Sequence, residues 1–166
     1  LAMNPLMVDI ACRVAPDQVT LVPENRKEVT TEGGLDVVRY KKELTETVRK
    51  LHDAGIAVSL FIDPEPAQIE TAASLLVPAV ELHTGAYANA KKDSQHELQI
   101  LAEAATFVHQ AGLILNAGHG LTYRNVTPIA EIQGMEELNI GHSIVARAVF
   151  VGMAEAVREM RDLIPH

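Results

Sequence analysis

The sequence has 166 residues, of which 48% are hydrophobic and 22% charged, a composition typical of an ordinary globular chain. Its 14 Lys and Arg residues against 22 Asp and Glu give a formal net charge of −8, with no basic block, which argues against nucleic-acid and membrane partners. A small phosphorylated ligand stays possible, because backbone N–H groups can bind phosphate without Lys or Arg.

Short β-branched runs alternate with helical patterns from one end of the chain to the other. This alternation is typical of βα units and a parallel sheet. Five runs are predicted as strands, at residues 18–22, 57–62, 79–83, 113–116 and 138–140.

The segments beside these strands carry helix signals. Residues 8–14 resemble a helix, and a helical pattern over 37–51 stops at Gly55, a good helix-ending residue. Ser94 and Glu97 have the spacing of a capping box at the start of a helix that ends at Gly112. A further helix is predicted to begin at Thr127-Pro128, and two more follow over residues 143–150 and 153–163.

Polar residues collect where the predicted strands end, and the carboxyl ends of parallel strands are where such folds place their functional groups. Several chemically capable strand ends favour a (β/α)₈ barrel over a doubly wound open sheet. The doubly wound fold is the alternative, weakened because no G-x-G-x-x-G follows a strand. The residues concerned are Glu24, Asp63, Glu81, His83, Thr84, residues 116–119 and residues 139–142.

Barrels commonly bind phosphate with the loops after strands seven and eight and a short extra helix. The last two predicted strands end in Gly118-His119-Gly120 and in Gly141-His142, and a short helix follows the second pair. We therefore expect residues 1–166 to be the C-terminal part of a single TIM-barrel domain, with the last five βα units present and the first three strands absent. A complete barrel takes about 250 residues, which agrees with this expectation.

The two Gly/His pairs are the first candidates for chemistry. Glycines let a backbone approach a ligand closely, and His142 would stand at a helix start, where partial positive charge favours an anion. Alternatively, these residues only make tight turns.

Glu81 and His83 alternate along one strand, so their side chains should point to the same side. A carboxylate and an imidazole there could move protons or stabilise a cation; the plainer alternative is a polar layer inside the barrel. A metal triad with His119 lacks any supporting motif, so no metal is predicted. The long polar loop over residues 23–34, which contains Thr30, is a further functional candidate.

Six blocks of the sequence together resemble the pyridoxine 5′-phosphate synthase family. They are LVPENR at 21–26, EVTTEGGLD at 28–36, VSLFID at 58–63, ELHTG at 81–85, NAGHGLTY at 116–123 and ELNIGHSI at 137–144. The resemblance extends over essentially the whole chain and implies a (β/α)₈ barrel with extra helices.

The resemblance also implies an activity and its residues. The family condenses 1-deoxy-D-xylulose 5-phosphate with 3-amino-2-oxopropyl phosphate to give pyridoxine 5′-phosphate, phosphate and water, in the cytoplasm, as an octamer assembled from dimers. No cofactor is implied. By motif, His119 resembles the proton donor and Glu81 the group that stabilises a cationic intermediate. Gly120, Gly141 and His142 resemble the site for the aminooxopropyl phosphate, and Thr30 resembles a contact to the deoxyxylulose phosphate.

The departure from the family pattern lies at the N-terminus. The family's third strand ends in a Glu that acts as a catalytic base, and by alignment this Glu would immediately precede Leu1. The alternative is therefore a truncated, non-catalytic remnant that binds phosphate. A third possibility, a Schiff-base aldolase or isomerase, lacks a Lys in any predicted strand.

Cysteine use and hydropathy bear on the compartment. Cys12 has no second cysteine to pair with, which favours a reducing compartment. No run of about 18 apolar residues and no signal-peptide pattern is found, so neither a membrane span nor secretion is predicted. We expect a cytoplasmic chain.

Overall fold

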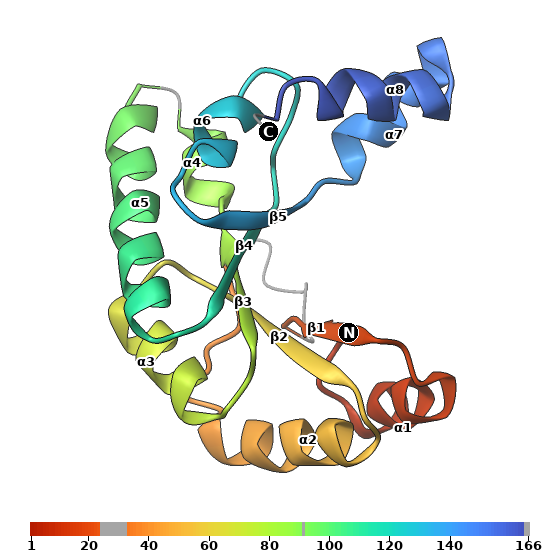
Figure 1. Cartoon of the computed structure of the whole chain (residues 1–166), viewed down its shortest axis with the longest axis vertical. Helices are drawn as coiled ribbons and strands as arrows, with labels where there is room; N and C mark the ends of the chain where they lie inside the picture. Colours follow the sequence, from red (N-terminus) through yellow and green to blue (C-terminus); the bar gives the residue numbers. More distant parts are fainter. Residues whose placement is uncertain (24–32, 91, 165–166) are drawn as a thin grey trace.

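The computed structural model describes residues 1–23, 33–90 and 92–164. Five parallel strands form one sheet in the order β1-β2-β3-β4-β5, the same as their order in the sequence (Figure 1). The strands are β1 (Gln18–Leu21), β2 (Ala57–Ile62), β3 (Ala79–His83), β4 (Ile114–Gly118) and β5 (Met135–Asn139). The prediction of an α/β fold with a parallel sheet is thus confirmed.

Helices connect the strands and continue past the last one. They are α1 (Pro5–Val14), α2 (Lys41–Asp53), α3 (Pro66–Ser74), α4 (Gly85–Asn89), α5 (Ser94–Gln110), α6 (Val126–Ala130), α7 (His142–Val151) and α8 (Met153–Arg161). Helices α2, α3 and α5 lie along the convex side of the curved sheet (Figure 1). Ala2 forms a parallel bridge with Val22 beside β1.

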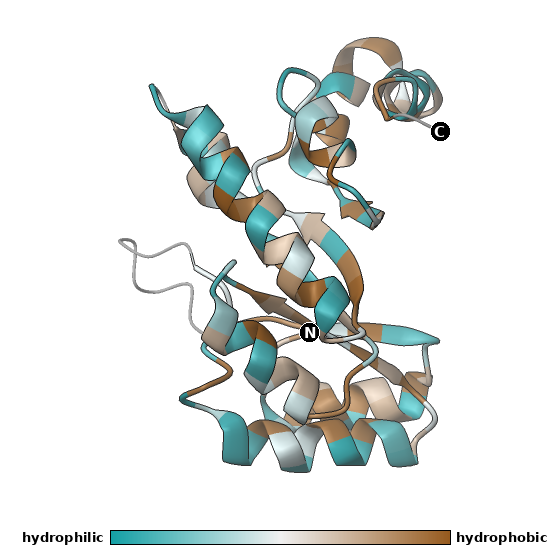
Figure 2. Cartoon of the chain, turned by 60° about the vertical axis from the view of Figure 1, so that its left-hand side comes forward, coloured by the Kyte–Doolittle hydropathy of each residue, from teal (hydrophilic) through white to brown (hydrophobic). Residues whose placement is uncertain are grey.

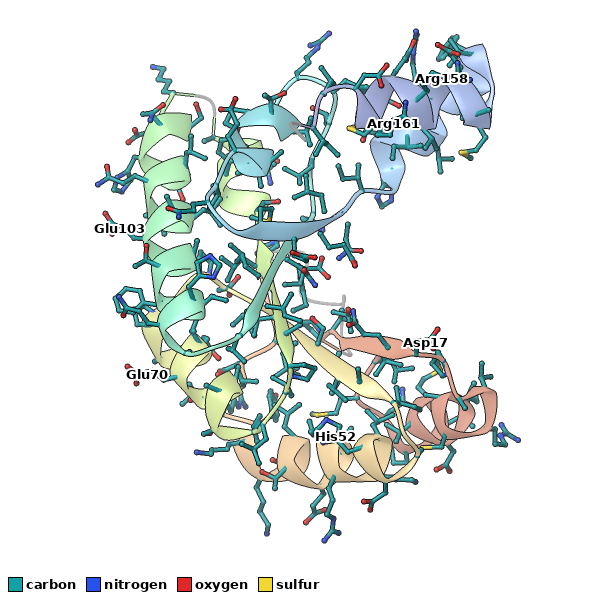
Figure 3. All side chains as sticks on the ribbon, in the orientation of Figure 1. Asp17, His52, Glu70, Glu103, Arg158 and Arg161 are labelled. Atoms are coloured by element: carbon teal, nitrogen blue, oxygen red, sulfur yellow. The ribbon has the colours of Figure 1, made fainter. Side chains whose placement is uncertain are left out.

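The core lies between the convex face of the sheet and these helices. Apolar strand residues such as Leu60, Val80 and Leu115 alternate along the strands and are almost fully buried, as the period-2 geometry of a strand requires. Leu44 and Leu51 of α2 meet them from the helical layer. The hydropathy colouring shows brown segments along the inner strands and teal over much of the outer helix surface (Figure 2). Exposed charged residues such as Asp17, Glu70 and Glu103 lie at the periphery (Figure 3).

Helix ends differ from the sequence predictions in several places. Asn4 caps α1, because its side chain accepts a hydrogen bond from Met7 N–H at 3.0 Å. The predicted capping box at Ser94 and Glu97 is wrong: Asp93 is the N-cap, and no side chain caps α5. Helix α2 begins four residues later than its apolar pattern, after a turn over residues 37–40 in which Val37 donates its N–H to Gln68 Oε1 at 2.8 Å.

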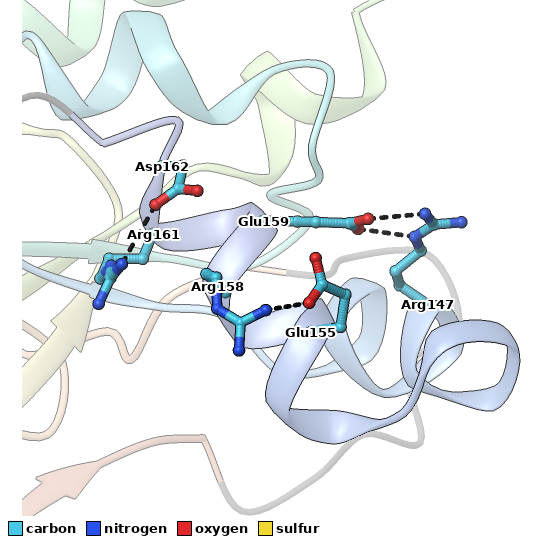
Figure 4. A network of polar contacts seen from close by, with 6 residues as sticks. All are labelled: Arg147, Glu155, Arg158, Glu159, Arg161 and Asp162. Atoms are coloured by element: carbon cyan, nitrogen blue, oxygen red, sulfur yellow. Dashed lines mark hydrogen bonds and ion pairs between the residues drawn. The ribbon is translucent and has the colours of Figure 1, made fainter.

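Helices α7 and α8 form a corner beyond β5. Arg147 of α7 contacts Glu159 of α8 through two 2.7 Å hydrogen bonds, and Arg158 pairs with Glu155 within α8 (Figure 4). Tyr123 Oη donates to the carbonyl of Ala156 at 2.8 Å, which fixes this corner to the loop after β4. No described helix is long and apolar enough to cross a membrane.

Candidate functional site

The register of the parallel strands gathers polar side chains on the face of the sheet away from the helices. Glu81 of β3 is aligned with Asn116 of β4, and His83 is aligned with Gly118, which in turn is aligned with Asn139 of β5. Register partners in a sheet point to the same side. The carboxyl ends of three neighbouring strands therefore present one continuous polar surface, which we call the strand-end site.

Glu81 is the most deeply buried carboxylate of this site, with 8% of its surface exposed. Asn139 Nδ2 donates a 3.0 Å hydrogen bond to Glu81 Oε2. Burial raises the pKa of Glu81 from its ordinary value of 4.5 to about 7, and the charge of Glu137 adds to the rise. The hydrogen bond from Asn139 and the nearby His83 lower the same pKa, with smaller effects. Glu81 can therefore take or release a proton near neutral pH.

Gly118 makes room for the Glu81 carboxylate. A Cβ at position 118 would overlap Glu81 Oε1 and lie 3.0 Å from the carbonyl oxygen of Asn139. Glycine is therefore required where β4 passes between the two side chains.

The side chain of His83 is held by Asp63, the residue that directly follows β2. The Nδ1 of His83 lies 2.9 Å from Asp63 Oδ1, and the same oxygen accepts the N–H of Gly34 at 2.8 Å. The hydrogen bond with His83 lowers the pKa of Asp63 below its usual range. Phe61 packs edge-on against the His83 ring, with 5.1 Å between centroids.

His119 stands at the end of β4 in a left-handed backbone conformation, with φ of 83°, which non-glycine residues seldom adopt outside functional or strained positions. Its ring centroid lies 4.9 Å from that of His83. Thr84 Oγ1 donates to the carbonyl oxygens of Gly118 and His119 at 2.8 and 2.5 Å. Gly120 also has a positive φ, and a Cβ there would approach Ala88 Cβ at 2.6 Å.

Gly141 and His142 lie at the start of α7, on the strand end beside His119. Gly141 is the N-cap of α7, and no side chain caps the helix. Ser143 Oγ donates to the carbonyl of Leu121 at 2.9 Å, which joins the helix start to the loop after β4. Backbone N–H groups at a helix start favour an anion.

Of the residues predicted from the sequence, Glu81 lies on β3, His119 and Gly120 directly follow β4, and Gly141 and His142 follow the adjacent strand β5. Thr30 lies outside the described residues. Within the described ranges, no three His, Cys, Asp or Glu side chains are placed to hold a metal ion.

Sequence reasoning marked Asn139 and Asp63 as polar strand-end residues but did not predict what they contact. It also gave no role to the side chain of Asn116, which is 3% exposed, and its Oδ1 has no hydrogen-bond partner in the structure. The register between strands is the signal for all three. Asn116 is aligned with Glu81, Asn139 is aligned with Gly118, and Asp63 comes directly after Ile62, which is aligned with the residue before His83.

Five parallel strands in one sheet, with polar side chains gathered at their carboxyl ends, define an α/β protein of the class that places its functional groups at that edge of the sheet. The chain matches the family model "Pyridoxal phosphate biosynthesis protein PdxJ" over residues 1–166. It belongs to this family.

Individual relatives agree with the family assignment. The chain is 60% identical over 156 residues to pyridoxine 5′-phosphate synthase of Rhodopirellula baltica, covering 93% of this chain and 63% of the relative. It is 56% identical over 166 residues to the enzyme of the same name from Thermosynechococcus vestitus, covering 99% of this chain and 70% of the relative. The chain thus spans about two thirds of the length of these relatives.

Solved structures show the fold alone at much lower identity. A xylose isomerase domain protein from Planctomyces limnophilus matches with a TM-score of 0.57 and 13% identity, over 95% of this chain and 66% of that one. A structure described as native KDPGal matches with a TM-score of 0.56 and 16% identity, over 97% and 68% of the two chains.

Proposed function

We propose that this chain carries part of the active site of a pyridoxine 5′-phosphate synthase, which condenses 1-deoxy-D-xylulose 5-phosphate with 3-amino-2-oxopropyl phosphate. The observation that carries the proposal is the 60% identity over 156 residues to an enzyme of that name. The products are pyridoxine 5′-phosphate, phosphate and water. No cofactor or metal takes part in the proposal.

The reaction needs groups that handle protons and charge in turn. An amine must condense with a carbonyl, phosphate must leave, and ring closure must expel water, so each step needs a positioned acid or base. We assign the proton donor to His119 and the stabilisation of a cationic intermediate to Glu81. A carboxyl whose pKa is about 7 carries negative charge in a large fraction of molecules at neutral pH, and burial strengthens its interaction with a neighbouring cation.

The phosphate of the aminooxopropyl substrate is proposed to lie between Gly120 and the start of α7. Gly141 and His142 offer backbone N–H groups there, beside a helix end with no side-chain cap. Thr30, which lies outside the described residues, is proposed to contact the deoxyxylulose phosphate.

The finer features of the assembly belong to the same proposal. We propose that the five βα units are part of a (β/α)₈ barrel, that the protein works as an octamer assembled from dimers, and that it acts in the cytoplasm. The curved sheet with helices on its convex side supports the barrel (Figure 1).

Product formation tests the activity. The 166-residue chain, and a chimera that adds the part of the Rhodopirellula baltica relative outside the match, are each incubated with both substrates, and pyridoxine 5′-phosphate is measured by chromatography and mass. We expect product from the chimera. A folded chimera that forms none would refute the synthase assignment. If phosphate still bound to that chimera in a titration followed by NMR, the result would support the non-catalytic remnant instead.

The role of His119 is tested in the active protein by His119→Ala. Removing a proton-transfer group costs about 10²- to 10⁴-fold in kcat, while the unfolding midpoint should stay near that of the parent. His52→Ala, at an exposed position of α2, is the control and should leave kcat unchanged. Parallel losses of stability and activity in His119→Ala would show a structural histidine.

A further inference from the structure

The Asp63–His83 contact is a second polar feature of the strand-end site, and the proposed chemistry does not use it. His83 is 6% exposed and lies on the same strand as Glu81. Its ring is surrounded by Phe61 of β2, Gly85 of α4 and His119 of the loop after β4. Packing alone does not require a buried imidazole to have a carboxylate at one ring nitrogen and a second imidazole beside it.

The partners of Asp63 determine which nitrogen of His83 carries the proton. Asp63 Oδ1 accepts the Gly34 N–H at 2.8 Å and lies 2.9 Å from His83 Nδ1. The pKa of this carboxyl is lowered, first by its hydrogen bond with His83, so the group is an ionised acceptor. An ionised carboxylate has no proton to donate, and the proton of the contact must therefore reside on His83 Nδ1.

The other ring nitrogen of His83 faces the gap between the two histidines. A Cβ on Gly85 would lie 2.5 Å from His83 Nε2 and 3.3 Å from His119 Cδ2. Gly85 therefore lies against both the His83 Nε2 edge and the His119 ring, and a side chain there would have to displace them. The two ring centroids are 4.9 Å apart, with the planes tilted by 56°.

We propose that Asp63 and His83 form a positioning pair for His119, in which Asp63 holds His83 in the Nδ1–H form and His83 fixes the place of the His119 ring. Asp63 also joins the pair to Gly34, because one carboxylate oxygen accepts both donors. Residues from the ends of β2, β3 and β4 are coupled in this way. The kinetic consequence rests on the proposed synthase activity, whereas the proton position does not.

Two variants separate the charge of Asp63 from its hydrogen bond. Asp63→Asn can keep an acceptor oxygen in place but removes the charge, and Asp63→Ala removes both. Asp36→Asn is the matched control, because Asp36 also accepts a backbone N–H, from Arg39, and a side-chain N–H, from Gln68, but its side chain is exposed and lies outside the strand-end site.

Histidine ring-nitrogen NMR of the ¹⁵N-labelled chain reads the pair directly. In the wild-type chain we expect the His83 proton on Nδ1. In Asp63→Ala we expect that preference to be lost and the His119 ring signals to move, whereas His52 signals should not move. A wild-type His83 with its proton on Nε2 would overturn the proposal, as would unchanged His119 signals in Asp63→Ala.

Kinetics of the active protein supply the second measurement. We expect Asp63→Ala to lower kcat by about tenfold or more, with KM changed by less than about threefold. Asp63→Asn should fall between Asp63→Ala and wild type, and Asp36→Asn should match wild type. An Asp63→Ala variant with the kcat of wild type would overturn the proposed pair. A variant in which kcat falls, KM rises and the melting temperature falls together would also overturn it, because Asp63 would then only hold the backbone. If wild type itself makes no product, the synthase assignment fails, and the NMR result still decides the pair.

Discussion

Glu81 is an acid whose position in the fold changes its chemistry. Its side chain is 8% exposed, and burial together with Glu137 raises its pKa to about 7. The folded chain therefore binds a proton at Glu81 more tightly than the unfolded chain does. By linkage, the stability that this proton contributes is present below about pH 4.5 and is lost as pH rises through about 7.

This linkage predicts the effect of Glu81→Gln. The wild-type free energy of unfolding should fall by about 1–3 kcal/mol between pH 4.5 and pH 8 through this group alone, with the upper value reduced for solvent screening. Glu81→Gln should lack that part of the fall and be more stable than wild type at pH 8. Urea denaturation at the two pH values measures it, with Glu70→Gln on the exposed side of α3 as the control. Identical pH profiles for wild type and Glu81→Gln would contradict the raised pKa.

Gly118→Ala tests the close approach of β4 to Glu81. A Cβ would overlap Glu81 Oε1 and touch Asn139, so the free energy of unfolding should fall by about 1–3 kcal/mol. In a Glu81→Ala background the same change should cost at least about 0.5 kcal/mol less, because the overlapping atom has gone. Additive losses in this double-mutant cycle would mean that Glu81 is not the obstacle.

At the scale of whole elements, the strands followed from the sequence better than the helix ends did. The predicted bounds of β2 and β3 match the observed ones. Apolar residues alternate along both strands, at Leu60 and Ile62 of β2 and at Val80 and Leu82 of β3, as a strand with one face packed under helices requires. Strand β5 was expected at residues 138–140 but spans Met135–Asn139, since the exposed Glu136 and Glu137 hide its pattern. Helix α3 was not predicted, although Pro66 stands in its first turn.

The strand-end site, too, could be predicted from the sequence only in part. The alternation of Glu81 and His83 was readable from one strand. The contacts of Asn139 with Glu81 and of Asp63 with His83 depend on the register between strands, over sequence separations of 58 and 20 residues. No local pattern encodes such a register.

Helix capping gives an element-scale prediction. Asn4 accepts a hydrogen bond from Met7 N–H at the start of α1, whereas Ser94 makes no capping bond at the start of α5. Asn4→Ala should therefore lower the free energy of unfolding by about 0.5–2 kcal/mol, and Ser94→Ala should change it by less than about 0.5 kcal/mol. Chemical denaturation of the two variants measures the difference. An equal loss in both would mean that Ser94 caps α5 in solution.

At the scale of the whole molecule, exposed apolar side chains gather at the corner of α7 and α8. Val149 and Phe150 are 79% and 83% exposed, and Val145, Met153 and Val157 are about half exposed. None of the described residues of α7 is buried. Exposed apolar groups that cluster in this way are typical of interaction surfaces, so the proposed oligomer predicts that copies of the chain meet at this corner.

Phe150→Asp tests whether this corner joins copies of the chain. A charge there should weaken self-association by at least about tenfold, since burying an unpaired charge at an interface is costly. Sedimentation velocity over a range of concentrations measures it. Leu6→Asp, at a position of α1 that is 66% exposed, is the control. Unchanged association in Phe150→Asp would place the contact elsewhere.

The order of the strands has a consequence for synthesis. Because β1 to β5 lie side by side in the order in which the chain is made, each new strand pairs with one that has already left the ribosome. No strand must wait for a later one to fill a gap within the sheet, and each step closes only the connection between two consecutive strands. We therefore expect these five strands to be added in chain order during translation, one βα unit at a time, with the Glu81–Asn139 contact forming only once β5 has joined β4.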